Sequence, residues 1–350
     1  MTVLCVLTQF VLPICAYADT PVSIGDNQTI AITKIVDLSK QLQAPKLRGQ
    51  HPKSHGTVWA EFTVAPDLPE NLRVGVFQQP EKTYPAWIRF SNGSAMDDTQ
   101  GGLHGMAIKL TGVEGDKVLE SEKAAKTQDF VMGDHPVFFM RNAKEFAGFF
   151  AALAENKGKL PVEFFLPDRT QELKILQAFQ QKQINNPLGA TYWSQTPYQF
   201  GNQAIKFAVK PTHQISAEMG TTRDYLRSSL VDYLKNQDAT FDFLIQLQGD
   251  TEKTPIEDPT VEWTEQNAPL QKVATIRIPR QVFDTLEQNA FGEALSFTPW
   301  HSLPEHQPLG SINLARKAVY QATSEQRHQE MGIAMEEPTP DSFTPHLLNL

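Results

Sequence analysis

The chain has few cysteines and no excess of positive charge. Its 350 residues include only Cys5 and Cys15, and both lie within residues 1–18. If that segment is removed, no thiol remains, which excludes disulfides, thiolate catalysis and thiolate ligation of a metal. The 31 Lys and Arg are outnumbered by 40 Asp and Glu, giving a formal net charge of -9, so no nucleic-acid partner is expected. The chemistry has to come from His, Tyr, Arg and carboxylates that act on small molecules.

Long apolar runs are also scarce, and the exception is the N-terminus. Residues 1–18 carry no charge, contain an apolar run from Val3 to Leu12 and end in A-Y-A. This pattern predicts a signal peptide cleaved before Asp19 and hence a periplasmic protein, although the usual basic residue at the front is missing. The run is too short to span a bilayer comfortably, so no stable membrane insertion is expected. The alternatives are a buried N-terminal segment and lipidation at Cys15.

Residues 19–350 are interpreted as a single domain, because a large barrel with helical additions can use that length. Seven short runs with strand-like alternation are separated by Pro, Gly and Asn, at 57–64, 73–77, 86–90, 106–110, 204–209, 241–248 and 272–278. Helical spacing occurs at 30–42, 143–155, 169–183 and 313–329. The predicted fold class is α+β: an antiparallel β-barrel of about eight strands, wide enough for side chains or one ligand, with added α-helices. The Pro-rich tail after Glu336 is expected to be loose.

Four short segments carry the candidate chemistry. They are R-G-Q-H-P-K at 48–53 with E-F-T-V at 61–64, W-I-R-F-S-N-G at 87–93, F-V-M-G-D-H-P-V-F-F-M-R at 130–141, and L-A-R-K-A-V-Y at 314–320. In the last segment, at about 100° per residue, Arg316 differs from Tyr320 by about 40° and from Arg327 by about 20°. One helix face therefore presents a phenol and two guanidinium groups.

In this order the segments resemble the catalase-like haem proteins, in particular the small catalase-related peroxidase branch. The resemblance implies haem b with ferric iron as the cofactor, with Tyr320 as the iron ligand and Arg316 favouring its phenolate. It also implies that His51 is the distal acid–base group and that Ser91 orients its ring. The remaining implied haem contacts are propionate partners and a stacking phenylalanine, at Arg48, Arg89, Arg327 and Phe146.

The chain departs from the family's pattern at several positions. The distal asparagine of the family is replaced by Gly133 or Asp134, depending on where a one-residue gap falls. An ionised Asp134 pointing into the pocket would only accept hydrogen bonds, and Gly133 would leave room for a larger substrate. His104 stands where the family's R-G-F-A-V-K strand has arginine, and Ala322 and Ser324 replace acidic and basic residues after the tyrosine.

These features predict a haem-dependent peroxidase, a monomer or homodimer, with haem inside the barrel. It would reduce hydrogen peroxide or organic hydroperoxides with an organic electron donor. The alternatives are a catalase, an enzyme that rearranges fatty-acid hydroperoxides, and a non-enzymatic haem or lipid carrier, which needs no distal base. A zinc site at His51 and His55 is disfavoured because Pro52 and Gly56 interrupt any helix there. The glycines at 101–102 precede a strand, so their dinucleotide-binding signal is weak.

We expect the mature protein to begin at Asp19, because A-Y-A supplies the small residues that signal peptidase requires. Intact-mass measurement and N-terminal sequencing of protein from periplasmic extract test this. Recovery of the chain with Met1 retained, in the cytoplasmic fraction, would contradict the prediction.

Overall fold

The computed structural model describes residues 26–215 and 218–348, so the predicted signal peptide at 1–18 and its cleavage site lie outside the described residues. The helices are α1 (Asp26–Leu42), α2 (Ala143–Glu155), α3 (Thr170–Gln181), α4 (Tyr225–Asn236), α5 (Leu286–Ala294) and α6 (Ser311–Met331). The strands are β1 (Lys53–Val64), β2 (Thr83–Asn92), β3 (His104–Thr111), β4 (Thr127–Gly133), β5 (Tyr192–Trp193), β6 (Tyr198–Phe200), β7 (Gln203–Pro211), β8 (Ala239–Leu247) and β9 (Leu270–Ile278).

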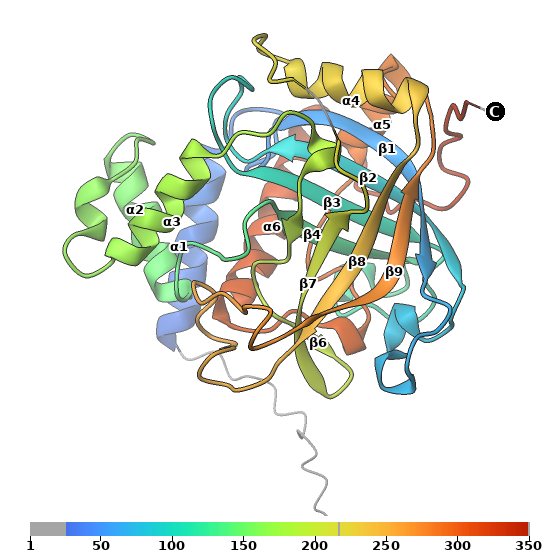
Figure 1. Ribbon diagram of the computed structural model, residues 1–350. Coiled ribbons are helices and arrows are strands. Elements are labelled where there is room, and N and C mark those ends of the chain that lie inside the picture. The colour runs from blue at the N-terminus through green and yellow to red at the C-terminus, as the bar shows by residue number, and fades with distance from the viewer. Residues whose placement is uncertain (1–25, 216–217, 349–350) are drawn as a thin grey trace, which may run out of the picture.

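Eight strands close into an antiparallel barrel. Their order is β5-β4-β3-β2-β1-β9-β8-β7, and β5 pairs again with β7, which completes the ring. The short strand β6 pairs with another stretch of β7. Figure 1 shows α1, α2 and α3 gathered on one side of the barrel and α4 across one end. The predicted α+β class, a barrel of about eight strands with added helices, is confirmed.

The interior of the barrel is filled by aromatic side chains. The ring of Phe243 lies 4.9 Å from that of Phe130, 5.3 Å from that of Phe62 and 5.5 Å from that of Phe207, measured between centroids. All four side chains are buried. The expectation of haem inside the barrel is therefore wrong, because this packing leaves no room there for a large planar ligand.

Side chains alternate across the barrel wall. On β2, Ile88 and Phe90 belong to the interior core, whereas Arg89 and Ser91 point to the outer face. The helix α6 lies on this outer face and ends at Gly332, whose left-handed backbone (φ 69°) is typical of a helix C-terminus. A ligand site built by these strands and α6 must therefore lie outside the barrel.

Two sequence-based expectations differ from the structure. The run 73–77 is not a strand, because Gly75 takes a left-handed backbone (φ 55°) and Gly75–Phe77 form a short 3-10 helix. The tail is anchored rather than loose: Glu337 accepts a hydrogen bond from Lys109 at 2.6 Å, and the Phe343 ring stacks on Phe291 with 5.0 Å between centroids. None of the helices in the described ranges combines the length and apolar character needed to cross a membrane.

Candidate functional site

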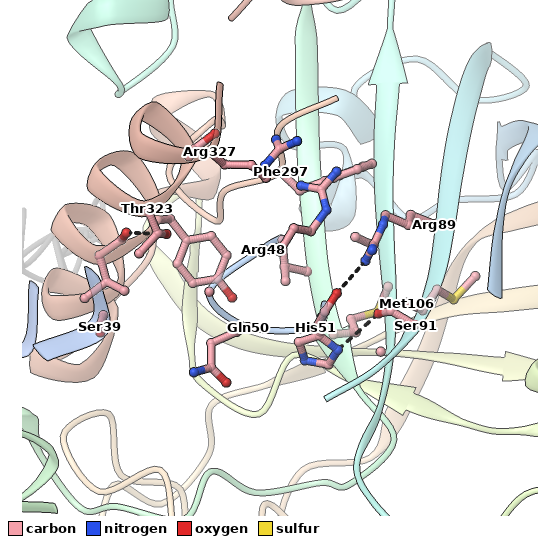
Figure 2. Close-up of a pocket in the computed structure, with 18 residues that line it drawn as sticks. Ser39, Arg48, Gln50, His51, Arg89, Ser91, Met106, Phe297, Thr323 and Arg327 are labelled. Carbon is pink, nitrogen blue, oxygen red and sulfur yellow. Dashed lines mark hydrogen bonds between the residues drawn. The ribbon is translucent and has the colours of Figure 1, made fainter. Parts of the chain in front are cut away.

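A pocket of about 760 Å³, which includes the part that opens to solvent, lies between α6, the loop before β1 and the outer wall of β2, β3 and β4 (Figure 2). Six of the nine candidate residues line it, namely Arg48, His51, Arg89, Ser91, Tyr320 and Arg327. Segments from opposite ends of the chain therefore meet at one cavity.

His51 is held by contacts to both its backbone and its ring. Its backbone takes a left-handed conformation (φ 56°), which is uncommon for a residue with a side chain. Its N–H donates to the carbonyl of Gly93 at 2.9 Å, and its carbonyl accepts from Nη1 of Arg89 at 3.0 Å. Nδ1 of the ring lies 3.1 Å from Oγ of Ser91, as the dashed line in Figure 2 shows. These bonds fix the direction in which the imidazole points.

The imidazole of His51 lies against the backbone of Gly105 on β3. A Cβ atom at Gly105 would lie 2.6 Å from Cε1 of His51 and 2.9 Å from Oγ of Ser91. Burial, followed by the positive charge of Arg89, lowers the pKa of His51 to about 3. The imidazole is therefore neutral at ordinary pH and can accept a proton.

Arg48, Arg89 and Arg327 surround a single carboxylate, that of Glu293 on α5. Arg89 Nη2 lies 3.4 Å and Arg48 Nε 3.9 Å from the Glu293 oxygens, and Arg327 donates to the Glu293 main-chain carbonyl. Nη2 of Arg48 and Nη2 of Arg327 share the carbonyl of Leu295, at 2.7 and 3.1 Å. The Glu293 carboxylate thus contacts two of the guanidinium groups, and among the described residues no second carboxylate contacts the cluster, so two of its three positive charges are not balanced.

Burial and the excess positive charge together lower the pKa values of Arg48 and Arg89. Burial and then the charge of Arg48 lower the pKa of Arg89 to about 9, while burial and then Arg327 lower that of Arg48 to about 10. Both remain protonated at neutral pH. Nε of Arg48 and Nε of Arg89 are buried and have no hydrogen-bond partner among the described residues. A ligand with two carboxylates would supply the missing charges and acceptors.

Tyr320 and Arg316 lie one turn apart on α6. Nη2 of Arg316 lies 3.4 Å from the phenol oxygen of Tyr320, and the guanidinium is 5.4 Å from the ring centroid. Arg316 is in turn fixed by Thr196 at 2.9 Å and Asn313 at 3.0 Å. Burial alone would lower the pKa of Arg316, but the phenol oxygens of Tyr320 and Tyr198 outweigh it and raise that pKa. Tyr320 lines the pocket. Arg316 does not line it but contacts the phenol of Tyr320.

Gly133 and Asp134 do not line this pocket. The buried Asp134 carboxylate accepts from the backbone N–H and from Nδ1 of His104, both at 2.8 Å, and lies 3.7 Å from Lys182. The side-chain amide of Gln195 occupies the space beside Gly133, 3.3 Å from where a Cβ would lie. Asp134 is thus turned toward His104, which the sequence alone did not predict.

Phe146 also lies apart from the pocket. It packs in the apolar cluster shared by α1, α2 and α6, with its ring 4.9 Å from that of Phe150 and 5.3 Å from that of Phe138, measured between centroids. The phenylalanine that does line the pocket is Phe297, whose ring centroid lies 5.8 Å from the guanidinium of Arg48. The sequence did not single out Phe297, Glu293 or Gln50. Phe297 and Glu293 lie outside the four segments that carry the candidate chemistry, and Gln50 lies inside R-G-Q-H-P-K at a position with no assigned role.

His55 has a structural role. Its ring Nε2 lies 2.7 Å from Oδ1 of Asn92, and Nδ1 is 4.0 Å from the Asp98 carboxylate. It does not line the pocket with His51, which contacts Ser91 instead. The two imidazoles thus serve different partners rather than one metal.

Residues 27–160 match the family model described as Catalase, whereas no curated protein matches the sequence. A fungal catalase superposes with a TM-score of 0.67 and 18% identity, covering 82% of this chain and 60% of the catalase chain. For catalase A from Saccharomyces cerevisiae the TM-score is 0.66 and the identity 18%, with 83% and 64% covered. A bacterial catalase gives a TM-score of 0.63 at 18% identity, with 89% and 62% covered.

The chain therefore has the catalase fold, with its pocket on the outer wall of the barrel. Its N-terminal part, residues 27–160, is the segment that matches the Catalase family model, and the superpositions on solved catalases extend the similarity of fold to most of the chain. The chain spans less than two thirds of the length of the solved catalases on which it superposes.

We expect Gly105→Ala to destabilise the protein and displace the His51 ring, because the new methyl group would overlap the imidazole. Overpacking of this kind typically costs about 1–3 kcal/mol in the free energy of unfolding. Thermal denaturation and a crystal structure of the variant measure both effects. Gly102→Ala is the matched control, since its Cβ would meet only Ala95, at 3.7 Å. An unchanged midpoint and an unmoved His51 in Gly105→Ala would contradict the prediction.

Proposed function

We propose that this protein is a haem-dependent peroxidase that reduces hydrogen peroxide or organic hydroperoxides with an organic electron donor, acting in the periplasm. One observation carries the proposal: a single pocket combines the His51 imidazole, the Tyr320 phenol and a cluster of three arginines with two unbalanced positive charges. A carrier needs the phenol and the charges but no imidazole held by a hydrogen bond.

The residues of the pocket fit a haem. Its two propionates would balance the two excess charges of Arg48, Arg89 and Arg327 and would meet the unpartnered Nε atoms. The Tyr320 phenol would hold the iron, with the Arg316 cation favouring its deprotonated form. When bound, haem iron supplies Lewis-acid and redox chemistry that no side chain here can provide.

The protein's own contribution to peroxide cleavage is proton transfer at His51. Nδ1 of His51 and Oγ of Ser91 are hydrogen-bonded, and in the tautomer in which Nδ1 carries the proton, Nε2 is the acceptor. The neutral imidazole would take the proton from one peroxide oxygen and return it to the other, which would leave as water or an alcohol. The two electrons for cleavage of the O–O bond would come from the bound haem, not from His51. Ser91 and Gly105 keep the ring in place during both transfers.

The surroundings of His51 favour a peroxidase over a catalase. Dismutation needs a second peroxide held by two fixed donors, and β4 offers none at its end. Gly133 has no side chain, and the Asp134 carboxylate is occupied by His104. Proton transfer by His51 requires neither of them, so the first half of the reaction is retained.

We expect dye-coupled peroxidase activity to exceed oxygen evolution, and organic hydroperoxides to be used at least as well as hydrogen peroxide. Both rates are measured on one haem-loaded sample, by donor absorbance and with an oxygen electrode. In the control Tyr320→Phe, most of the haem is lost, because a phenyl ring cannot bind iron. Vigorous oxygen release by the wild type would show that the ranking of the two activities is wrong.

The activity should tolerate mild acid. Since the pKa of His51 is lowered to about 3, its neutral form persists well below the ordinary pKa of about 6.5. We expect kcat/KM for peroxide to stay flat from pH 7 to about pH 4.5 and to fall only as acid protonates the imidazole. In His51→Ala, haem content stays normal and the rate drops by about 10²–10⁴ across the range. A wild-type midpoint near pH 6.5 would contradict the lowered pKa.

A further inference from the structure

Most polar side chains around the pocket already have partners within the protein. Besides the arginines, the hydroxyl of Thr323 donates to the carbonyl of Val319 at 2.8 Å, and the Ser324 hydroxyl lies 2.6 Å from that of Ser296. Among the described residues that line the pocket, two neutral polar side chains have no hydrogen bond. They are Ser39 and Gln50.

The positions of these two side chains differ. Ser39 is buried on α1, which packs against α6. Gln50 is exposed and lies between Gly49 and His51 in the loop before β1. A Cβ at Gly49 would lie 3.2 Å from Cγ2 of Thr323 on α6, whereas His51 lies against β3, so the loop crosses the pocket from one wall to the other. Figure 2 shows the Gln50 side chain beside that of His51.

We propose that Gln50 is a substrate-binding residue whose amide donates a hydrogen bond to the peroxide beside His51. This inference rests on the proposed function. A neutral carboxamide offers two N–H donors, which an ionised carboxylate such as that of Asp134 cannot offer. His51, as a neutral base, accepts the peroxide proton, so a separate donor is needed for the lone pairs of the oxygens.

The lack of a partner for Gln50 also limits what it does. No hydrogen bond to another described residue fixes its amide, so it is not one of the two fixed donors that dismutation requires. It contributes to binding of the peroxide, and therefore to KM, more than to the rate of proton transfer, which belongs to His51. The amide should equally stabilise any small anion bound at the iron.

Gln50→Leu tests this, because leucine keeps much of the side-chain volume and removes the donor. On haem-loaded protein we expect fluoride to bind roughly tenfold more weakly, the loss typical of one hydrogen bond to a charged group. KM for hydrogen peroxide should rise by a similar factor, with kcat changed less than about threefold. Gln50→Asn, which keeps the donor on a shorter chain, should recover part of the fluoride affinity.

The control is Gln100→Leu, which changes an exposed glutamine outside the pocket and should leave both constants unchanged. Fluoride affinity and KM in Gln50→Leu equal to those of the wild type would overturn the inference, as would a fall in kcat alone. These outcomes are distinct from failure of the proposed function, in which the wild type itself would bind no haem or oxidise no donor with peroxide.

Discussion

Aromatic packing inside the barrel is the constraint on which the rest of the architecture depends. Because Phe62, Phe130 and Phe243 fill the interior, a cofactor-sized ligand can be held only against the outer wall. That wall is one layer thick, so a second layer has to cover it, and α6 does so. The outward residues Arg89 and Ser91 then line the covered pocket, although strand alternation alone would leave them facing solvent.

The buried charges give the pocket its selectivity. The three guanidinium groups gathered near Glu293 have lowered pKa values, first because they are buried and then because they repel one another. Hydrogen bonds offset part of this repulsion, because carbonyls near the end of α5, such as that of Leu295, accept from Arg48 and Arg327. A neutral or cationic ligand would leave the repulsion in place, whereas a dicarboxylate relieves it. The cluster therefore discriminates by charge before any shape is matched.

The sequence could predict the strands with clear alternation and the amphipathic helices, and its short motifs identified His51, Ser91 and Tyr320. It could not predict β4, because Gln128 and Asp129 interrupt its apolar pattern and are buried only by partners distant in sequence. It could not decide which side of the barrel wall would hold the ligand, since interior and outer residues alternate equally. The orientation of Asp134 was equally hidden, because it depends on His104 across the sheet.

The two walls of the pocket come from opposite ends of the chain. His51 precedes the first strand and Tyr320 lies on the last helix, with the whole barrel between them. Contacts across such a separation carry a large loop-closure entropy, which only the pairing of the intervening strands offsets. A ligand that needs both walls therefore finds its complete site only on the folded barrel.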